Sequence, residues 1–456
     1  MSSTTRIDRR AWLSTAATTL ATLRLADAER SPKRLRVGAV ITTCFYRSHA
    51  HVILENFLNP YLFNGQVVDA GMDVVSLYVD QFPKNDMARS IAESHSIPIY
   101  DSIAGALTRG GRELDVDAVL SIGEHGDYPV NHKAQRMYPR KRFFDEIVAV
   151  FRRSGRTAPV FNDKHLSYRW DWAKEMVDTA RRLHIPLMAG SSVPLAERRP
   201  PLELPAGAAI REAVSIHGGG VESYDFHGLE VLQSMVEARR GGESGVARLR
   251  FLDFDRLWRA AERKEWSTAL AQSAMRAELG PDHELVRCFD RRGLDDVGKP
   301  VPMHGIQLEY ADGLRAIMLK VADSGIRWNF ACRMAGESAH RATSFYVGPW
   351  NNRNLFKALS HAIQTHFRNR RAPYPVERTL LTTGMLDAAM DSRIRHGKWL
   401  DTPHLTWHYE PRDYRAMREM GATWKLIPPG TPQPRGLDHA SLHLGDRAGE
   451  PERARP

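Results

Sequence analysis

The sequence lacks the features of membrane proteins and of disulfide-stabilised secreted domains. In 456 residues no stretch approaches the roughly 20 consecutive apolar residues that are needed to cross a bilayer. Three cysteines, Cys44, Cys288 and Cys332, lie too far apart in sequence for a disulfide framework or a Cys-x-x-Cys metal knuckle. The net charge of +10 comes from scattered arginines, without the basic stripe and interleaved aromatics of a nucleic-acid-binding surface. We therefore expect neither a membrane span nor a nucleic-acid partner.

The N-terminal residues have the order of features found in a twin-arginine export signal. Arg9-Arg10 stands just before an aromatic residue and a leucine, a mildly apolar run extends from Leu13 to Leu23, and Ala26-Asp27-Ala28 offers small residues for cleavage. Arg24, late in the apolar run, favours the opposite interpretation of an accidental arginine pair. We expect residues 1–33 to be a leader and the protein to be exported to the periplasm; without a functional signal it would be cytoplasmic.

Residues 34–192 alternate short apolar runs with helical segments. The runs are continuous rather than alternating, which is typical of strands buried on both faces of a sheet. They are Leu35–Ile41, Met72–Val79, Ile97–Tyr100 and Val116–Ile122. Strands and helices that alternate in this way indicate βαβ units. The sequence therefore predicts an α/β fold that begins with a Rossmann-like, doubly wound parallel sheet.

Residues 193–427 differ from the preceding segment in their proline content and in their pattern of apolar residues. Prolines cluster just after residue 193, and several segments then alternate apolar and polar residues. These segments are Val246–Leu252, His304–Tyr310, Arg315–Val321 and Trp328–Met334. Asp312-Gly313 is a hairpin signal between two of them. We expect a C-terminal α+β domain with a largely antiparallel open sheet, one face of which is solvated, and a disordered tail over residues 428–456.

Several motifs lie along the chain in a recognisable order. Asp117-Ala118-Val119 begins the fourth strand, Val160 to Leu166 contains Asp163-Lys164, and Gly218-Gly219-Gly220 precedes His227. From about residue 35 to 410 the chain resembles the Gfo/Idh/MocA family of glucose–fructose oxidoreductases and inositol dehydrogenases. The resemblance implies an oxidoreductase that transfers hydride between NAD or NADP and a sugar, a cyclitol-type polyol or a derivative, in a cleft between two domains. It also implies a homo-oligomer.

The expected phosphate-binding loop departs from the family pattern. A dinucleotide site normally opens with G-x-G-x-x-G, because glycines let backbone N–H groups approach the pyrophosphate. The stretch from Ile41 to His49 contains no glycine, and Phe45 and Tyr46 would crowd that space. The resemblance places the cofactor contacts, in altered form, at Thr42, Thr43, Arg47, His49 and Asp80. An acidic residue at the position of Asp80 favours NAD over NADP, because it would repel a 2′-phosphate.

The resemblance assigns the catalytic roles to Lys164, Asp163 and His227. The matching lysine of the family lies between the substrate hydroxyl and the nicotinamide ribose and relays a proton, while Asp163 replaces the family's glutamate. His227 is the candidate general base. Ser223 stands where the family has the aspartate that supports this histidine, so Glu230, three residues after His227, is a candidate to orient it.

Acidic and histidine residues after the fourth strand suggest a substrate site and a rival function. Glu124 and His125 stand where the family has Thr-Pro, and with Glu230 they are the candidate substrate contacts. Two groups of potential ligands would bind a divalent metal if they met across the cleft. They are His217, Glu222, Asp225, His227 and Glu230, and Glu124, His125, Asp127 and His132.

Three functions remain open at this point. The first is the hydride-transferring oxidoreductase. The second is an enzyme on the same scaffold that uses no nicotinamide and is metal-assisted or metal-free, and the third is a catalytically silent carbohydrate-binding protein. Aromatic and arginine residues in the second domain are candidates for a sugar platform or for ordinary packing. They are Trp350, Arg353, Trp399 and Trp407.

Overall fold

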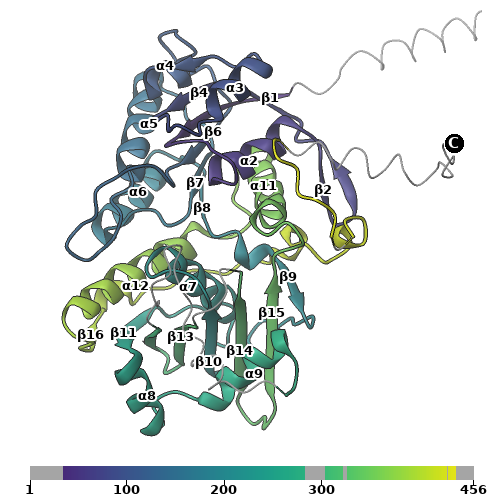
Figure 1. Ribbon diagram of the computed structural model, residues 1–456. Coiled ribbons are helices and arrows are strands. Elements are labelled where there is room, and N and C mark those ends of the chain that lie inside the picture. The colour runs from purple at the N-terminus through teal and green to yellow at the C-terminus, as the bar shows by residue number, and fades with distance from the viewer. Residues whose placement is uncertain (1–33, 283–302, 322–325, 429, 438–456) are drawn as a thin grey trace, which may run out of the picture.

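The structure, a computed structural model, describes residues 34–282, 303–321, 326–428 and 430–437. Figure 1 shows two α/β parts, each built on one large sheet, with α11 and α12 lying where the two parts meet. The expected leader and Cys288 lie outside the described residues. No helix in the described ranges is long and apolar enough to span a membrane.

The first part is a six-stranded sheet in the order β5-β4-β1-β6-β7-β8, with every neighbouring pair parallel. The strands are β1 (Leu35–Ile41), β4 (Met72–Val79), β5 (Ile99–Tyr100), β6 (Ala118–Ile122), β7 (Val160–Asp163) and β8 (Leu187–Gly190). The helices are α2 (His49–Leu58), α3 (Ala88–Ser94), α4 (Ile103–Thr108), α5 (Arg140–Ser154) and α6 (Trp170–Arg182), and β2 (Tyr61–Phe63) and β3 (Gln66–Val68) form a small hairpin. This strand order is that of the doubly wound dinucleotide fold, which confirms the sequence prediction.

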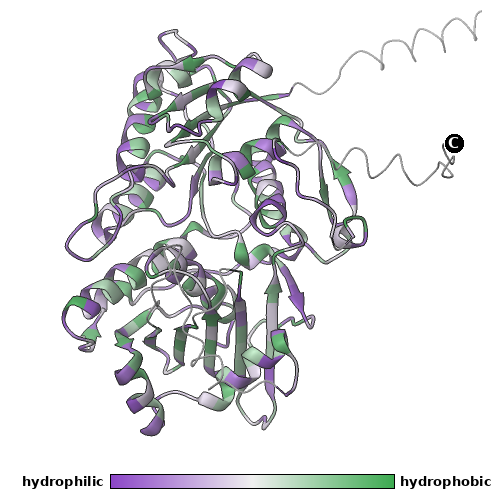
Figure 2. Cartoon of the chain, in the orientation of Figure 1, coloured by the Kyte–Doolittle hydropathy of each residue, from purple (hydrophilic) through white to green (hydrophobic). Residues whose placement is uncertain are grey.

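The apolar pattern of the sequence explains why this sheet is covered on both faces. Residues Val37 to Ile41 of β1 are all buried, as a central parallel strand requires. In α5 the residues Phe143, Ile147, Val150 and Phe151 recur at helical spacing and pack into the core below the sheet. The helix ends at Gly155, whose φ of 60° is a left-handed cap. Figure 2 shows hydrophobic residues concentrated on the strands and hydrophilic residues along the outer helix faces.

The second part is an eight-stranded sheet in the order β16-β11-β12-β13-β10-β14-β15-β9. Its strands are β9 (Glu197–Arg199), β10 (Ile210–His217), β11 (Val246–Asp253), β12 (His304–Tyr310), β13 (Arg315–Lys320), β14 (Trp328–Met334), β15 (His340–Tyr346) and β16 (Leu400–Asp401). All pairs are antiparallel except β10 with β13. The hairpin expected at Asp312-Gly313 joins β12 to β13. The predicted α+β class with a largely antiparallel open sheet is therefore confirmed.

The expectation that one face of this sheet is solvated is wrong. Helix α7 (Ser223–Val236) and helix α12 (Val376–Ile394) pack on one face, and α8 (Phe254–Glu262) and α9 (Thr268–Leu279) pack on the other. On the second face Leu257, Leu270 and Met275 form a buried cluster with Ile216 and Leu319 of the sheet. The strands on this face carry apolar side chains at the positions that the helices cover, so the alternation in the sequence did not mark a wet face.

Helix α11 (Asn352–Asn369) returns from the C-terminal half to pack against α2 of the first part. Tyr61 donates a hydrogen bond to Gln364 at 2.8 Å, and Asn56 donates to Ser360 at 3.0 Å. Arg353 forms a buried ion pair with Glu55. These polar contacts fix how the two parts of the chain sit against each other.

His361 on α11 gives a testable pH dependence. Its ring stacks on Phe63 with centroids 4.2 Å apart, and burial, followed by Arg368, lowers its pKa to about 4. In the unfolded chain a histidine has a pKa near 6.5. Between pH 6.5 and 4 the unfolded chain therefore binds a proton that the folded chain does not bind, so the free energy of unfolding falls as the pH falls. We expect His361→Phe, which keeps the stack, to lose less thermal stability from pH 7 to 4.5 than wild type, by about 2 °C in Tm. Parallel Tm profiles would contradict this.

Candidate functional site

A cavity of about 390 Å³ lies at the carboxyl ends of the parallel strands, against the start of α7 and α11. In this fold the ligand crevice forms at that edge of the sheet. Its polar lining includes Arg47, His49, Glu124, His125, Lys164 and His227. The structure thus brings together six of the side chains that the sequence singled out. We call this cavity the cleft.

Glu124 holds two cationic side chains at the floor of the cleft. Lys164 lies directly after β7, and its Nζ is 3.4 Å from Glu124 Oε1. Arg140, at the start of α5, pairs with the other carboxylate oxygen. Burial alone would raise the pKa of Glu124, but Lys164 and Arg140 hold it well below its usual range. The carboxylate therefore stays ionised and fixes the lysine at the cleft surface.

Asp163 does not enter the cleft but supports a residue that does. Its Oδ2 lies 2.6 Å from Nδ1 of His49, the first residue of α2. The side chain of Asp163 is buried, and that of His49 is 11% exposed. This pair ties the end of β7 to the N-terminus of α2, on either side of the cleft.

His227, on the first turns of α7, is oriented by a serine rather than by Glu230. Its Nδ1 lies 2.6 Å from Oγ of Ser191, which follows β8. Burial, with Lys164 next in importance, lowers the pKa of His227 well below 6.5, so the ring is neutral. Glu230 is buried, accepts a hydrogen bond from Thr382 at 2.7 Å and lies outside the cleft lining.

One wall of the cleft is aromatic. Tyr224 and Trp328 line it, and their rings are parallel to within 3° with centroids 5.5 Å apart. The four residues considered as a sugar platform lie elsewhere: Trp350 and Arg353 pack beneath the C-terminal segment, Trp399 stacks with Arg248 and Arg250, and Trp407 contacts Tyr409. An apolar wall opposite convergent polar groups is the usual composition of a small-molecule site.

The backbone around the cleft is strained. Arg47, His125, Lys164 and Asn351 all line the cleft and all have positive φ, between 53° and 70°. Residues with a Cβ are uncommon in this region and cost about 1–2 kcal/mol each, and such residues cluster at active sites and ligand clamps. The concentration of four of them on one cavity supports a functional role for it.

The expected cofactor contacts fit a dinucleotide only in part. Lys164 and His49 lie in the cleft, where the reacting end of a ligand would sit. Thr42 and Thr43 are buried, and the Thr42 hydroxyl donates to the backbone carbonyl of Glu124 at 2.5 Å. Asp80 accepts hydrogen bonds from Tyr78, Tyr128 and Arg142 at 2.5–2.6 Å. The residues at the phosphate-binding turn therefore do not fit a pyrophosphate as they stand.

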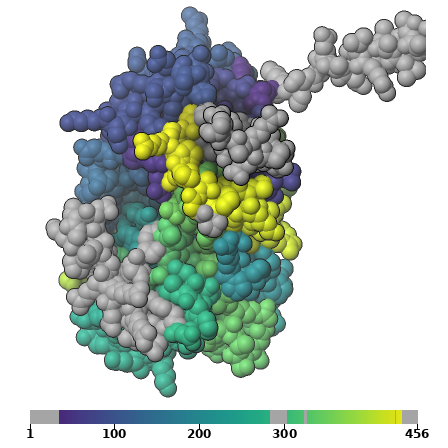
Figure 3. All heavy atoms as spheres, turned by 45° about the vertical axis from the view of Figure 1, so that its right-hand side comes forward, coloured from purple at the N-terminus to yellow at the C-terminus, as the bar shows by residue number. Residues whose placement is uncertain are grey.

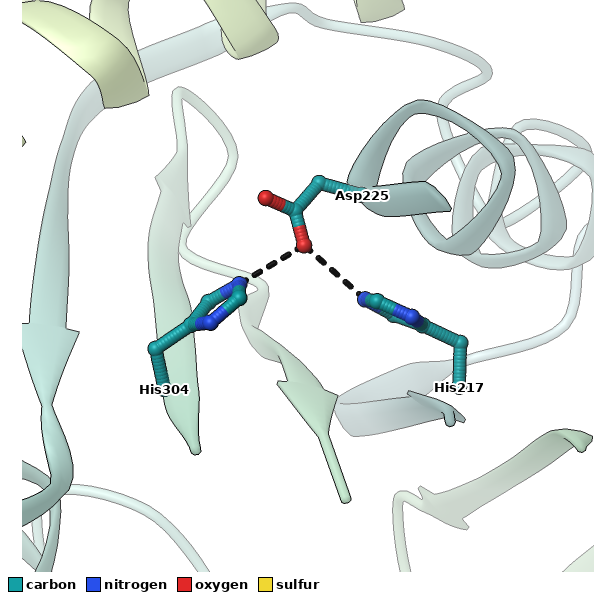
Figure 4. Close-up of side chains that lie close together, drawn as sticks. All are labelled: His217, Asp225 and His304. Atoms are coloured by element: carbon teal, nitrogen blue, oxygen red, sulfur yellow. Dashed lines mark hydrogen bonds and ion pairs between the residues drawn. The ribbon is translucent and has the colours of Figure 1, made fainter. Parts of the chain in front are cut away.

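A second polar cluster lies behind the aromatic wall (Figure 4). His217 Nε2 and His304 Nε2 lie 2.9 and 2.7 Å from the same oxygen of Asp225. All three side chains are buried and within the distances of a metal centre. However, the Gly219 N–H donates to Nδ1 of His217, so the ring proton is on Nε2, where a metal would have to bind. We conclude that the cluster is a hydrogen-bond network that anchors the start of α7.

The other suggested metal ligands do not join this cluster. Among the described residues Asp127 pairs through its backbone with Gln81, and His132 is exposed. Glu222 is buried, and burial raises its pKa to about 7, although Arg140 opposes the shift. Glu124, His125 and His227, which come from both suggested ligand groups, do line the cleft together. Among the described residues, however, only His217, Asp225 and His304 bring their ligand atoms within metal-binding distance of one another.

Four residues of the site were not predicted from the sequence. Ser191 carried a usable signal, because it follows the sixth parallel strand and hence faces the crevice. The other three could not be predicted, because the role of each depends on a partner distant in sequence. Arg140 pairs with Glu124, Trp328 stacks with Tyr224, and His304 bonds to Asp225.

Comparison with solved structures gives the fold a precedent. GenD2 from gentamicin A biosynthesis, solved in complex with NAD, aligns with a TM-score of 0.53 at 11% identity over 82% of this chain and 97% of its own. An oxidoreductase from Agrobacterium radiobacter in complex with NAD+, L-tartaric acid and magnesium aligns at 0.49, with 13% identity over 81% and 98% of the two chains. Myo-inositol 2-dehydrogenase from Lactobacillus plantarum aligns at 0.47, with 10% identity over 81% and 99%.

No family model and no curated protein matches the chain. The structural likeness therefore concerns the fold. The chain has the fold of Gfo/Idh/MocA-type oxidoreductases, as the sequence motifs implied. GenD2 shows that a protein with this fold holds NAD, the cofactor that the resemblance implies.

The network around Asp225 leads to a prediction about metal and stability. In Asp225→Ala the N–H groups of His217, His304 and Glu222 lose their acceptor, and each orphaned buried donor costs about 1–3 kcal/mol. We expect a fall of about 5 °C or more in Tm, and a smaller fall in Asp225→Asn, which keeps an acceptor oxygen.

The matched measurement is the Tm of wild type with EDTA and with Zn²⁺. For a hydrogen-bond network we expect equal values. A Zn²⁺-induced rise in wild type that is lost in Asp225→Ala would instead identify a metal site.

Proposed function

We propose that the chain is an enzyme that acts on a sugar, a cyclitol-type polyol or a related polyhydroxylated small molecule in the cleft. The main observation behind the proposal is that Lys164, Glu124 and His227 line one cavity. This cavity has an aromatic wall, and several of its lining residues have a positive φ. The likeness of the fold to GenD2, which comes from gentamicin A biosynthesis, supports an enzyme on this scaffold.

The residues of the cleft suit acid–base chemistry at a hydroxyl-bearing carbon. Lys164 is held by Glu124 and by the carbonyl of Ser223 at 3.4 Å, so its remaining N–H bond is available to a ligand hydroxyl. The neutral ring of His227, steadied by Ser191, accepts a proton from a ligand hydroxyl. The rings of Tyr224 and Trp328 offer a surface for the apolar C–H face of the same ligand.

Hydride transfer with NAD or NADP is the second candidate. The NAD bound by GenD2 favours it, since a nicotinamide at the cleft would accept the hydride that leaves the carbinol carbon. The crowded turn after β1 weighs against hydride transfer, because it leaves little room for a pyrophosphate.

Location and assembly are further proposals. The twin-arginine pattern of residues 1–33 supports export to the periplasm, and the resemblance supports a homo-oligomer. Mass spectrometry of protein from the periplasmic fraction would show whether residues before Leu35 are removed, and light scattering would give the oligomeric state.

The test of the proposed function is a panel of sugars and cyclitols. We expect at least one to bind by calorimetry and to be converted, as followed by NMR, and we expect Lys164→Ala to lower the turnover rate about 100-fold. Lys133→Ala is the control, because Lys133 pairs with Asp387 and Asp391 and does not line the cleft. Conversion that survives in Lys164→Ala would refute the assignment. Binding without conversion would indicate a binding protein instead.

A further inference from the structure

The turn after β1 departs from a phosphate-binding turn in its hydrogen bonding as well as its composition. In the dinucleotide fold the N–H groups at the start of the first helix point at the pyrophosphate. Here the N–H groups of Phe45 and His51 both donate to Oγ of Ser48, at 3.0 and 3.3 Å. The Arg47 N–H donates to Nδ1 of His51 at 2.8 Å, and the Ser48 N–H donates to the Phe45 carbonyl at 2.9 Å. Four backbone N–H groups in and beside the turn are therefore already engaged within it.

The side chains of the same turn point to other parts of the protein. Arg47 and Asn352 exchange two hydrogen bonds: Arg47 Nε donates to Asn352 Oδ1 at 2.9 Å, and Asn352 Nδ2 donates to the Arg47 carbonyl at 2.8 Å. Asn352 is the first residue of α11, so the turn is joined to the helix that packs along α2. The Nε–H of the cation that could have met a phosphate is used in this contact.

The C-terminal segment of residues 430–437 covers the turn. Tyr46 donates its hydroxyl proton to the Pro434 carbonyl at 3.0 Å. Arg353, the second residue of α11, donates to the carbonyls of Pro434 and Gly436, and Trp350 donates to that of Thr431. Figure 3 shows this segment lying on the surface across the N-terminal and C-terminal parts of the chain. The protein itself thus contacts the outer side of the turn, while the Tyr46 side chain stays 38% exposed.

The ribose end of the expected site is filled as well. Both oxygens of Asp80 are engaged by Tyr78, Tyr128 and Arg142. Although burial would raise it, the pKa of Asp80 is lowered by these three partners, beginning with Tyr128. A ribose diol would have to displace a hydroxyl donor and a guanidinium from this carboxylate.

We infer that the turn between β1 and α2 is a structural joint that holds α11 and the C-terminal segment, and that it is closed to the pyrophosphate of a dinucleotide. The contacts to Asn352 and to Pro434 take the place of the anion. A closed turn leaves the acid–base roles proposed for Lys164 and His227 unchanged, whereas it excludes hydride transfer with a dinucleotide held at this turn.

The direct test is calorimetric titration of the whole protein with NAD+, NADH, NADP+ and NADPH, together with analysis of nucleotide released on denaturation. We expect no released nucleotide and no saturable binding up to about 1 mM, a concentration well above the affinity of a functional site. A Kd below that value, or stoichiometric released nucleotide, would overturn the inference. Binding of a polyol in the same calorimeter reports on the cleft separately.

A second test addresses the joint. Asn352→Ala removes both hydrogen bonds to Arg47, and we expect it to lower Tm by about 2 °C or more. Asn369→Ala, on the exposed end of the same helix, is the matched control and should leave Tm unchanged. An Asn352→Ala variant as stable as the control would show that the contact is not a joint, and the inference would fail.

Discussion

The arrangement of the cleft depends on one buried carboxylate between two cations. Lys164 directly follows β7 and Arg140 begins α5, and without Glu124 the like charges of these buried side chains would repel each other. The pairing holds the end of β6 against the ends of its neighbours. It also stabilises Lys164 in a backbone conformation with a φ of 65°, which a residue with a Cβ adopts only when its surroundings require it.

Side-chain contacts also explain why the turn after the first parallel strand contains no glycine. Glycine is required where a ligand phosphate must approach the backbone closely. In this chain the approaching groups are side chains, Ser48 from within the turn and Asn352 from α11, and these reach the N–H and C=O groups without close backbone contact. In this chain a turn without glycine and its contact with α11 therefore fit together in one structure.

Local patterns in the sequence predicted the helices and strands, but they did not predict contacts between residues that are distant in sequence. The bounds of β1, β12 and β14 are those expected, because a buried run or an alternation is visible within a few residues. The parallel pairing of β10 with β13 has no local signal, and neither does the cover of α8 and α9.

The candidate site follows the same division. Lys164, Glu124 and His125 were predictable because they follow strands whose carboxyl ends share one edge. Ser191 as the partner of His227, in place of Glu230, depended on the packing of β8 against α7. The hydrogen bonding of Asp80 likewise depends on Tyr128 and Arg142, which are distant in sequence.

The charges of the cleft also constrain the ligand. Glu124 lies between Lys164 and Arg140, which leaves one positive charge in excess, and Asp163 is paired with His49. His227 is neutral because of its burial and the nearby lysine. An anionic ligand would have to compete with Glu124 for Lys164, whereas a neutral hydroxyl can hydrogen-bond to the lysine while the ion pair persists. The ion pair around Lys164 therefore suits a neutral hydroxyl, while the guanidinium of Arg47 adds a further positive charge to the cleft lining.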